Sequence, residues 1–524
     1  MNIVGARTVR SALEQKVRAH PDKPFVVFED ASGGVQSCTY GELDERVNRT
    51  ANLLRSLGVG RGDRFNVHLP NCLEFLACWF AGAKLGAVMV PTNIVEPSDA
   101  MAYLLGFSRS RVAVTQPEYL GAIAEARGRC RDLRHVVLCR TSKAETDTLL
   151  YDELVRTHSC DLPDTGLAPH DDCAMVFTSG TTSRPKGCLI THANYVYAGE
   201  SVGKSLRLAP DDRHMVVLPL FHVHAQYYQT MTALIAGASL ALIERFSASR
   251  YFDQVIRHGA TLGGLFAAPI RMILAQPRRP ELRANPLRLV QFAMSVTESQ
   301  LEEWHERFGA PLVQMYGMTE TIGQPTINPL DAPRKNMSIG TVALGYECKV
   351  VDDQGIEVPV GAEGQLIVRG EPGVTLMKGY SDDPQATAET IRQGWLWTGD
   401  VVRMDEDGYF WFVDRAKDLI KRAGENVAAG EVEAVLKQHP AVFDAAVVGV
   451  PDPIRDEAVL AYVVRRDGAR ATAEELIRFC EPRLAKFKVP ELVEFRDELP
   501  RTPVGKIQKH LLRAEARAKW ESRA

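Results

Sequence analysis

The stretch AMVFTSGTTSRPKG, residues 174–187, decides how the rest of the chain is interpreted. It begins with an apolar run, residues 174–177, that is typical of a buried strand. It continues into residues 178–187, which combine hydroxyl side chains, glycines and one lysine. Glycine allows close approach of the backbone, successive N–H groups and hydroxyls donate to anionic oxygens, and Lys186 adds a positive charge. The stretch therefore predicts a strand followed by a loop that binds a polyphosphate.

This loop does not have the spacing of a Walker A phosphate loop. Lys186 is followed by glycine rather than by serine or threonine, and no glycine directly precedes it. Taken alone, the same residues are also compatible with a polar surface turn. Many proteins bind a triphosphate, so the loop indicates the anion but does not define the reaction.

The length and composition describe an ordinary globular protein with more than one domain. The chain has 524 residues, of which 45% are hydrophobic and 24% are charged, and a single core rarely grows to this size. Lys and Arg number 62 against 66 Asp and Glu, which gives a net charge of −4. This balance provides no global field for nucleic acid or for an anionic membrane, so anions must be bound locally.

The cysteines and the N-terminus favour a cytoplasmic protein. The ten cysteines form no Cys-x-x-Cys pair, which favours free thiols in a reducing compartment over a zinc or redox site. Residues 1–24 carry charges throughout and lack the apolar core of a signal peptide. The longest apolar stretch, residues 76–90, is interrupted by Lys84 and is too short to cross a bilayer.

Helix and strand patterns alternate through the first 400 residues. Thr39 and Glu42 have capping-box spacing, and apolar residues then recur with a helical period until Gly58. The same rhythm continues downstream and predicts a large layered α/β body. The predicted strands are residues 64–69, 87–90, 214–219 and 239–243, and further predicted helices are residues 72–85 and 249–258.

Strand-rich segments beyond Asp400 indicate a second, smaller α+β domain that begins near Arg415. We place the two domains at residues 1–414 and 415–524. The predicted elements of the second are strands at residues 408–414 and 445–450 and a helix at residues 431–438. The tail, residues 511–520, is predicted to be a short basic helix with a solvated face.

Five motifs, in a fixed order along the chain, carry a resemblance to a known family. They are residues 178–187, Tyr316-Gly317-Met318-Thr319-Glu320, Trp397-Thr398-Gly399-Asp400, Asp414-Arg415-Ala416-Lys417-Asp418-Leu419-Ile420-Lys421 and Pro500-Arg501-Thr502-Pro503-Val504-Gly505-Lys506. With them the sequence resembles, essentially end to end, the acyl-adenylate-forming superfamily of acyl-CoA synthetases, adenylation domains and beetle luciferases. Within it, residues 180–186, 454–458 and 479–490 are most similar to the crotonobetaine/carnitine–CoA ligases.

The resemblance implies a fold, a reaction and its cofactors. The fold is a large N-terminal α/β domain of several subdomains, which binds ATP and the acid, with a smaller mobile C-terminal α+β domain. The reaction adenylates a carboxylic acid with ATP and Mg²⁺ and transfers the acyl group to coenzyme A. Loading of a carrier protein in trans is the alternative, since no carrier domain follows Lys506. A homodimer is common in the superfamily.

Two further functions are disfavoured by the residues present. Lys506, Glu320 and Asp400 together argue against a regulator that only binds ATP. A luciferase-type oxygenase belongs to the same superfamily, but no oxygen chemistry is readable in the sequence.

The resemblance also implies roles in nucleotide binding. The phosphate loop, with Thr178, Ser179, Gly180, Thr181, Thr182 and Lys186, would hold the β- and γ-phosphates. Tyr316 would stack on adenine, in the motif that includes Gly317 and Met318, and Thr319 would donate to the α-phosphate. Glu320 and Thr181 would hold Mg²⁺. Asp400 would accept both ribose hydroxyls, and Arg415 would reach the ribose or the phosphates.

The C-terminal domain would act in both half-reactions. Lys506 would cover the α-phosphate and the carboxylate during adenylation, where it would block the path of the thiol. The domain should therefore rotate about a hinge at Lys417. After rotation Gly424 would face the pantetheine tunnel, and Lys421 and Arg422 would contact the phosphates of coenzyme A.

The acyl pocket is where the sequence departs from the family. Members commonly carry Gly-Gly-Ala or Gly-Gly-Glu before the Tyr316 motif, whereas residues 292–297 read FAMSVT. The predicted pocket wall is residues 221–228, 266–269, Met294 and 321–323. His222 is predicted to gate the pocket, since no third ligand completes a metal site with His224. The aromatic residues suit a quaternary ammonium and equally an aryl, terpenoid or short acyl group.

Overall fold

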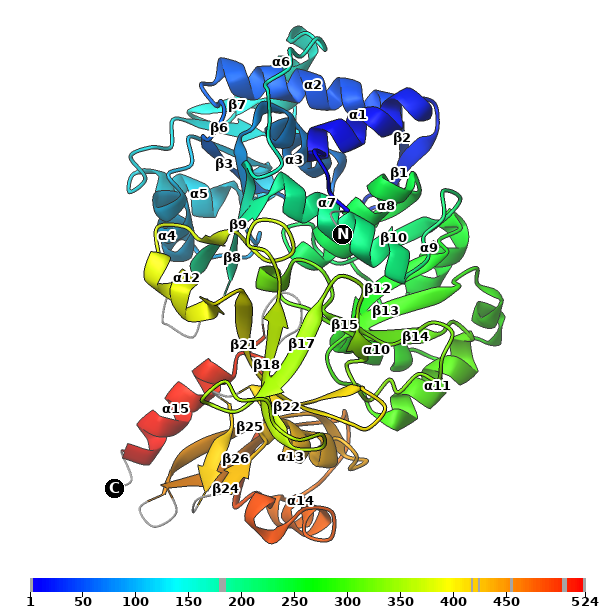
Figure 1. The fold of residues 1–524 in the computed structure, drawn as a ribbon, viewed down its shortest axis with the longest axis vertical. Coiled ribbons are helices and arrows are strands. Elements are labelled where there is room, and N and C mark those ends of the chain that lie inside the picture. The colour runs from blue at the N-terminus through cyan, green and yellow to red at the C-terminus, as the bar shows by residue number, and fades with distance from the viewer. Residues whose placement is uncertain are drawn as a thin grey trace.

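The computed structural model describes residues 3–178, 185–415, 418–422, 425–452, 456–501 and 507–521. It is mixed α/β, with a large N-terminal domain and a smaller C-terminal domain at one end of the long axis (Figure 1). The boundary predicted between residues 414 and 415 falls at the end of β22 (Phe410–Arg415). The position of that boundary stays a prediction.

Two largely parallel sheets form the body of the N-terminal domain. One has the strand order β16-β15-β14-β13-β12-β10-β11-β1-β2 and is parallel from β14 to β1. The other has the order β19-β9-β8-β4-β3-β5-β6-β7 and is parallel from β8 to β7. Parallel pairing requires crossover connections, which accounts for the helices between these strands.

The strands predicted at residues 64–69, 87–90, 214–219 and 239–243 are present as β3, β4, β10 and β11, with ends that lie within three residues of the predicted ones. In the first sheet the strands are β1 (Pro24–Glu29), β2 (Val35–Thr39), β10 (Arg213–Val216), β11 (Ser239–Ile243), β12 (Leu262–Phe266), β13 (Leu289–Ala293), β14 (Leu312–Tyr316), β15 (Thr326–Ile327) and β16 (Thr341–Val342). In the second they are β3 (Arg64–His68), β4 (Val88–Pro91), β5 (Val112–Thr115), β6 (His135–Leu138), β7 (Thr148–Leu150), β8 (Asp172–Thr178), β9 (Lys186–Thr191) and β19 (Gly379–Tyr380).

Helices of the N-terminal domain pack around the two sheets, and one of them is almost entirely buried. They are α1 (Val9–Ala19), α2 (Tyr40–Ser56), α3 (Leu73–Leu85), α4 (Ser98–Ser108), α5 (Leu120–Arg127), α6 (Tyr151–Thr157), α7 (His192–Ser205), α8 (Met231–Ala236), α9 (Tyr251–His258), α10 (Ala267–Leu274), α11 (Glu298–Phe308) and α12 (Pro384–Thr390). In α3 even Lys84 is buried, because its ammonium pairs with Asp44 over 2.6 Å.

The predicted start of α2 is confirmed in atomic detail. Glu42 N donates to Thr39 Oγ1 over 3.1 Å, and Thr39 N donates to Glu42 Oε2 over 2.8 Å. These reciprocal bonds satisfy two N–H groups that the first turn of a helix leaves without partners. The capping box therefore fixes where the helix begins.

A third, antiparallel sheet lies between this body and the C-terminal domain (Figure 1). Its order is β17-β18-β21-β20, and β22 pairs with β21. The bounds are β17 (Glu347–Val351), β18 (Glu363–Arg369), β20 (Ile391–Arg392) and β21 (Trp395–Met404). Two of the predicted nucleotide ligands, Asp400 and Arg415, lie on this sheet.

The C-terminal domain is a mixed sheet covered by helices on both faces. Its order is β24-β23-β26-β25, with β27 paired to β26. Alternate residues of β25 face opposite sides, so Val447 packs in the cluster that includes α13 and α14, and Val448 packs in the cluster that includes α15. The bounds are β23 (Ile420–Arg422), β24 (Glu425–Val427), α13 (Ala429–Leu436), β25 (Val442–Asp452), β26 (Asp456–Arg465), α14 (Ala473–Cys480), β27 (Leu492–Arg496) and α15 (Lys509–Glu521).

The prediction for the C-terminal tail is half right. The helix is present as α15, but its predicted solvated character is wrong for one side. Leu512 and Ala516, which are four residues apart and share a face, are buried against the sheet.

Within the described ranges, no helix is both long and apolar enough to cross a membrane.

Candidate functional site

The flanks of the predicted phosphate loop are cross-strand neighbours. β8 ends at Thr178, β9 begins at Lys186, and the antiparallel register pairs these two residues directly. Both residues are therefore presented at the same end of the sheet. The predicted ligands between them, Ser179, Gly180, Thr181 and Thr182, lie outside the described residues.

Tyr380, which the sequence analysis did not single out, lies between two of the predicted site residues. Its hydroxyl donates to Glu320 Oε1 over 2.9 Å. The ammonium of Lys186 lies 5.0 Å from the centroid of the same ring. Glu320 is only 5% exposed, so this tyrosine is a large part of its surroundings. Lys186 and Glu320, which are far apart in the chain, thus meet through one side chain.

The turn that carries Thr319 and Glu320 is strained and tightly held. It is a short 3₁₀ segment, η4 (Thr319–Thr321), and Ile322 follows it with φ 63° and ψ −68°. A β-branched residue rarely adopts this backbone conformation. The Tyr346 hydroxyl accepts from Gly323 N over 2.8 Å and donates to Thr321 O over 2.7 Å. Strained backbone that its surroundings hold in place is typical of functional sites.

Tyr316 and Arg415 form a cluster around the buried carboxylate of Asp400. The Tyr316 hydroxyl donates to Asp400 Oδ2 over 2.6 Å. Arg415 Nε lies 3.2 Å from Asp400 Oδ1, and the register of β21 and β22 pairs these two residues directly. Burial and the neighbouring carboxylate of Asp400 raise the pKa of Tyr316, so its hydroxyl keeps its proton and acts as a donor. Residues from three separate sequence motifs therefore meet at one place.

The predicted acyl-pocket wall is aromatic and carries neutral histidines. The ring of His224, on the π-helical segment η2 (His224–Thr230), lies 5.2 Å from that of Tyr228 and 5.1 Å from that of Phe266. Burial lowers the pKa of His222 to about 4 and that of His224 to about 3. Both rings are therefore uncharged at neutral pH. Nε2 of each ring has no hydrogen-bond partner among the described residues.

Glycines beside this wall are enclosed by protein side chains. A Cβ on Gly317 would lie 2.4 Å from Tyr228 Oη, and a Cβ on Gly264 would lie 2.8 Å from Gln229 Nε2. Real Cβ contacts are not that short, so these positions require glycine. The same contacts show that side chains already fill the space next to Gly264, within β12, and next to Gly317, directly after β14.

The segment that departs from the family keeps the backbone shape of a glycine turn. Met294 follows β13 with φ 73°, in the left-handed region, and its side chain is 38% exposed. A non-glycine residue pays about 1–2 kcal/mol for this conformation. This chain therefore places a methionine side chain on a backbone conformation that glycine adopts without that cost.

Part of the predicted C-terminal machinery can be placed. The predicted residues Lys417, Gly424 and Lys506 lie outside the described residues. Arg501 and Ile507, which flank the Lys506 segment, pair through a β-bridge. Arg422 is buried, and its guanidinium donates to Phe487 O over 2.7 Å and pairs with Glu491. Its contact with the phosphates of coenzyme A stays a prediction.

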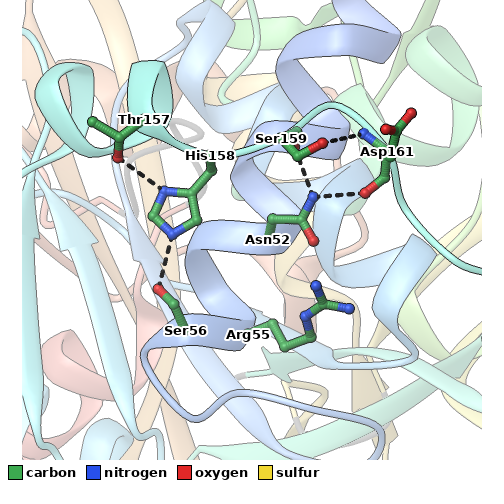
Figure 2. Close-up of a pocket in the computed structure, with 7 residues that line it drawn as sticks. All are labelled: Asn52, Arg55, Ser56, Thr157, His158, Ser159 and Asp161. Carbon is green, nitrogen blue, oxygen red and sulfur yellow. Dashed lines mark hydrogen bonds between the residues drawn. The ribbon is translucent and has the colours of Figure 1, made fainter.

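A polar surface cavity lies away from all of these residues. It has a volume of about 380 Å³ and is formed by α2 and the segment that includes the end of α6 and the residues after it (Figure 2). Asn52 Nδ2 donates there to the carbonyl oxygens of Ser159 and Asp161. None of the predicted site residues lines the cavity, so we assign it no part in the reaction.

Comparison with known proteins defines the class. Residues 13–381 match the AMP-binding enzyme family, and residues 431–506 match the AMP-binding enzyme C-terminal domain. The chain belongs to the AMP-binding enzyme family. The predicted superfamily is thereby confirmed, whereas the roles of individual residues stay predictions.

Relatives narrow this class further. A protein named crotonobetaine/carnitine–CoA ligase from Salmonella paratyphi A is 40% identical over 518 residues, which is 98% of this chain and 100% of the relative. A structure of the anthranilate CoA ligase AuaEII in complex with anthranoyl-AMP superimposes with a TM-score of 0.90 at 27% identity, covering 98% of both chains. ATP-bound MatB from Rhodopseudomonas palustris superimposes with a TM-score of 0.86 at 28% identity, covering 97% of this chain and 99% of MatB. These neighbours confirm the predicted fold class.

Proposed function

We propose that this protein is an AMP-forming carboxylate–CoA ligase, which makes an acyl adenylate from ATP and then an acyl-CoA. The observation that carries the proposal is the cluster that Tyr316 and Arg415 form around the buried Asp400, because the family motifs assign all three residues to the nucleotide. The relatives add support, since they are named CoA ligases and their structures include one with an acyl-AMP and one with ATP.

The reaction needs two displacements, because a carboxylate does not condense with a thiol at neutral pH without a leaving group. In the first, a carboxylate oxygen attacks the α-phosphorus of ATP in line and the bond to pyrophosphate breaks. In the second, the thiolate of coenzyme A attacks the acyl carbonyl, the bond to AMP breaks, and the thiol proton passes to solvent. Positioning and neutralisation of negative charge supply most of the catalysis in the first step.

We assign the charges of the site to parts of the nucleotide. The phosphate loop and Lys186 neutralise the departing pyrophosphate, and Thr319 donates to the α-phosphate. Asp400 accepts from the ribose hydroxyls, which suits a carboxylate because it has lone pairs for several donors. Lys506 covers the α-phosphate during adenylation and leaves when the C-terminal domain rotates.

Mg²⁺ is the metal that this donor set fits. It usually takes one or two carboxylates and completes its shell with phosphate oxygens and water. Glu320 supplies one carboxylate, and the hydrogen bond from Tyr380 occupies only one of its two oxygens. We propose that Glu320 and Thr181 hold the ion, which would neutralise the triphosphate when bound.

We propose that the acid is compact and tolerates a positive charge. Side chains fill the space beside Gly264 and Gly317, which disfavours long chains and bulky ring systems. The neutral rings of His222 and His224 do not repel a cation, and aromatic faces attract one. An acid with a trimethylammonium group should therefore react better than its neutral tert-butyl analogue, by about 2-fold to 30-fold in kcat/KM for a cation–π contribution of about 0.5–2 kcal/mol.

Three further properties complete the proposal. The acceptor is free coenzyme A, and a carrier protein supplied in trans is the competing acceptor. The compartment is the cytoplasm, because ten cysteines without disulfides suit a reducing environment. The oligomeric state is a homodimer, which is common in the superfamily, and light scattering of the purified protein measures this state.

The test is a screen of acids by ATP–pyrophosphate exchange, followed by detection of the thioester. The panel contains betaines, aryl acids, short-chain acids and cyclic terpenoid acids, each with and without Mg²⁺. We expect Mg²⁺-dependent exchange with a small set of compact acids and a thioester that saturates with free coenzyme A. Exchange without any coenzyme A thioester would instead favour the carrier protein, and no acid-dependent exchange at all would refute the ligase.

A further inference from the structure

Tyr380 belongs to a short segment that connects two distant parts of the nucleotide site. β19 (Gly379–Tyr380) pairs with β9, the strand that follows the phosphate loop. The pairing is extended on both sides, since Lys378 N donates to Leu189 O over 3.0 Å and Ser381 N donates to Gly187 O over 2.7 Å. We call residues 377–381 the bridge segment.

The bridge segment is also bonded to the turn that carries Glu320. Met377 N donates to the backbone carbonyl of Glu320 over 2.9 Å, and the Tyr380 hydroxyl donates to its side chain. One short segment thus fixes both the backbone and the carboxylate of Glu320 relative to β9. Lys186, the first residue of β9, places its ammonium over the Tyr380 ring.

Two different parts of the Tyr380 side chain make these contacts. The hydroxyl is a charge-assisted donor to a carboxylate, which is among the stronger hydrogen bonds in proteins. The ring face attracts an ammonium within about 6 Å. Lysine has a long flexible side chain, and holding it in one place before the ligand arrives reduces the entropy lost on binding.

We propose that Tyr380 is a positioning residue that aligns Lys186 and Glu320 for binding of the metal–nucleotide complex. The inference rests on the proposed function, because it takes Lys186 and Glu320 as nucleotide-binding residues. Tyr380 acts through its neighbours: the hydroxyl orients Glu320, and the ring holds the ammonium of Lys186 close to the place where phosphate arrives.

Two substitutions separate the hydroxyl from the ring. Tyr380→Phe removes the hydrogen bond to Glu320 and keeps the aromatic face. Tyr380→Leu removes both. The loss of affinity on removing the hydroxyl should therefore depend on Glu320 and not on whether residue 186 is lysine. The further loss on removing the ring should depend on Lys186 alone.

The experiment measures binding rather than turnover. Isothermal titration calorimetry gives the Kd of the Mg²⁺ complex of α,β-methylene-ATP for each variant and each double variant. The bridge between the α- and β-phosphorus atoms of this analogue is not cleaved, so it cannot transfer AMP to an acid. Tyr380→Phe is expected to weaken binding about 3-fold to 10-fold in the wild-type background and less than about 2-fold in Glu320→Gln, because residues in contact couple by about 0.5–3 kcal/mol. Tyr380→Leu should lose about a further 3-fold, and that extra loss should disappear in Lys186→Met.

Tyr409 provides a matched control away from the predicted site. Its hydroxyl donates to Pro333 O, and Lys335 Nζ lies 4.5 Å from its ring centroid, so it also combines a hydroxyl donor with a ring beside an ammonium, with a backbone carbonyl in place of the carboxylate. Tyr409→Phe and Tyr409→Leu should change the Kd less than about 2-fold. They report the cost of losing such contacts where no nucleotide binds.

The outcomes distinguish this inference from the proposed function. If the wild-type protein does not bind the nucleotide analogue, the proposed function fails. If the wild type binds but the losses from Tyr380→Phe and Glu320→Gln simply add, Tyr380 is not a positioning residue. Tyr380→Leu could fail to fold, and the pair Tyr380→Phe and Glu320→Gln decides the question without it.

Discussion

Asp400→Asn gives the most direct test of the nucleotide site. The substitution is nearly isosteric, but it removes the negative charge and leaves one acceptor oxygen where there were two. In the structure Oδ2 already accepts from Tyr316 over 2.6 Å and Oδ1 faces Arg415. The single, uncharged oxygen of asparagine therefore has to serve both Tyr316 and any ribose hydroxyl, and its NH₂ group cannot accept from either.

The size of the effect follows from the burial of this carboxylate. The Asp400 side chain is only 4% exposed, so water compensates little for a lost bond. A hydrogen bond to a charged group contributes about 1.5–3 kcal/mol, which corresponds to about 10-fold to 100-fold in affinity for each ribose hydroxyl. We expect Asp400→Asn to lower kcat/KM for ATP by that amount in pyrophosphate exchange.

The assay compares ATP with 2′-deoxy-ATP and 3′-deoxy-ATP. The wild type should prefer ATP over each deoxy analogue, and Asp400→Asn should reduce at least one preference to within about threefold. Asp405→Asn is the control, because Asp405 accepts from Lys335 and Trp411 near the end of the same strand. A variant Asp400→Asn that keeps the full wild-type preference for both hydroxyls would show that this carboxylate does not touch the ribose.

Four other substitutions test the domain cycle and the stability of the fold. Lys506→Ala should lower ATP–pyrophosphate exchange by about 10²–10³-fold while thiolation of a supplied acyl adenylate survives, and equal loss of both steps would exclude the two-state cycle. Gly424→Leu should do the reverse, so unchanged coenzyme A turnover would contradict the tunnel. Gly340→Ala should lower the free energy of unfolding by about 3 kcal/mol in urea titrations, because the added Cβ would lie 2.1 Å from a backbone carbon of β15. Gly361→Ala is the control, since Gly361 has a similar φ but open space around the position of a Cβ. Burial opposes the shift, but three neighbouring cations lower the pKa of Asp444 to about 2. A carboxyl group whose pKa is lower in the folded than in the unfolded state stabilises the fold at pH values above the unfolded pKa. The free energy of unfolding of the wild type should therefore exceed that of Asp444→Asn by about 2 kcal/mol above about pH 5, and the difference should shrink as the pH falls through about 4 towards 2. A difference that does not change with pH would contradict the pairing.

Local signals predicted the elements of the fold well because each has a cause within a few residues. The capping box at Thr39 and the apolar run before Thr178 are complete in the sequence, and α2 and β8 appear where they indicate. The bounds of other elements differ by a few residues, as at α9, which begins at Tyr251 rather than at residue 249. The buried side of α15 was missed because two apolar positions among many charges look like a solvated helix.

The site required information that no local pattern contains. Tyr316 and Asp400 are 84 positions apart. Only the resemblance to a family assigned both residues to one site before the structure showed their hydrogen bond. Tyr380 follows a glycine in a short segment without periodicity, so nothing in the sequence connects it with Lys186. The sequence likewise suggests a phosphate ligand at Arg422, a basic residue near the hinge, and only the structure shows that this residue is buried and paired with Glu491.

The bridge segment also has a consequence for the synthesis of this protein on the ribosome. Gly379 pairs with Leu189, which is translated 190 residues earlier. At about 5–20 residues per second, the β9 edge that this pairing covers waits roughly 10–40 s for its partner. An unpaired strand edge is a template for aggregation. The nascent chain therefore carries an open edge next to its phosphate loop for nearly half of the time in which the N-terminal domain is made, and slower translation between these positions prolongs that exposure.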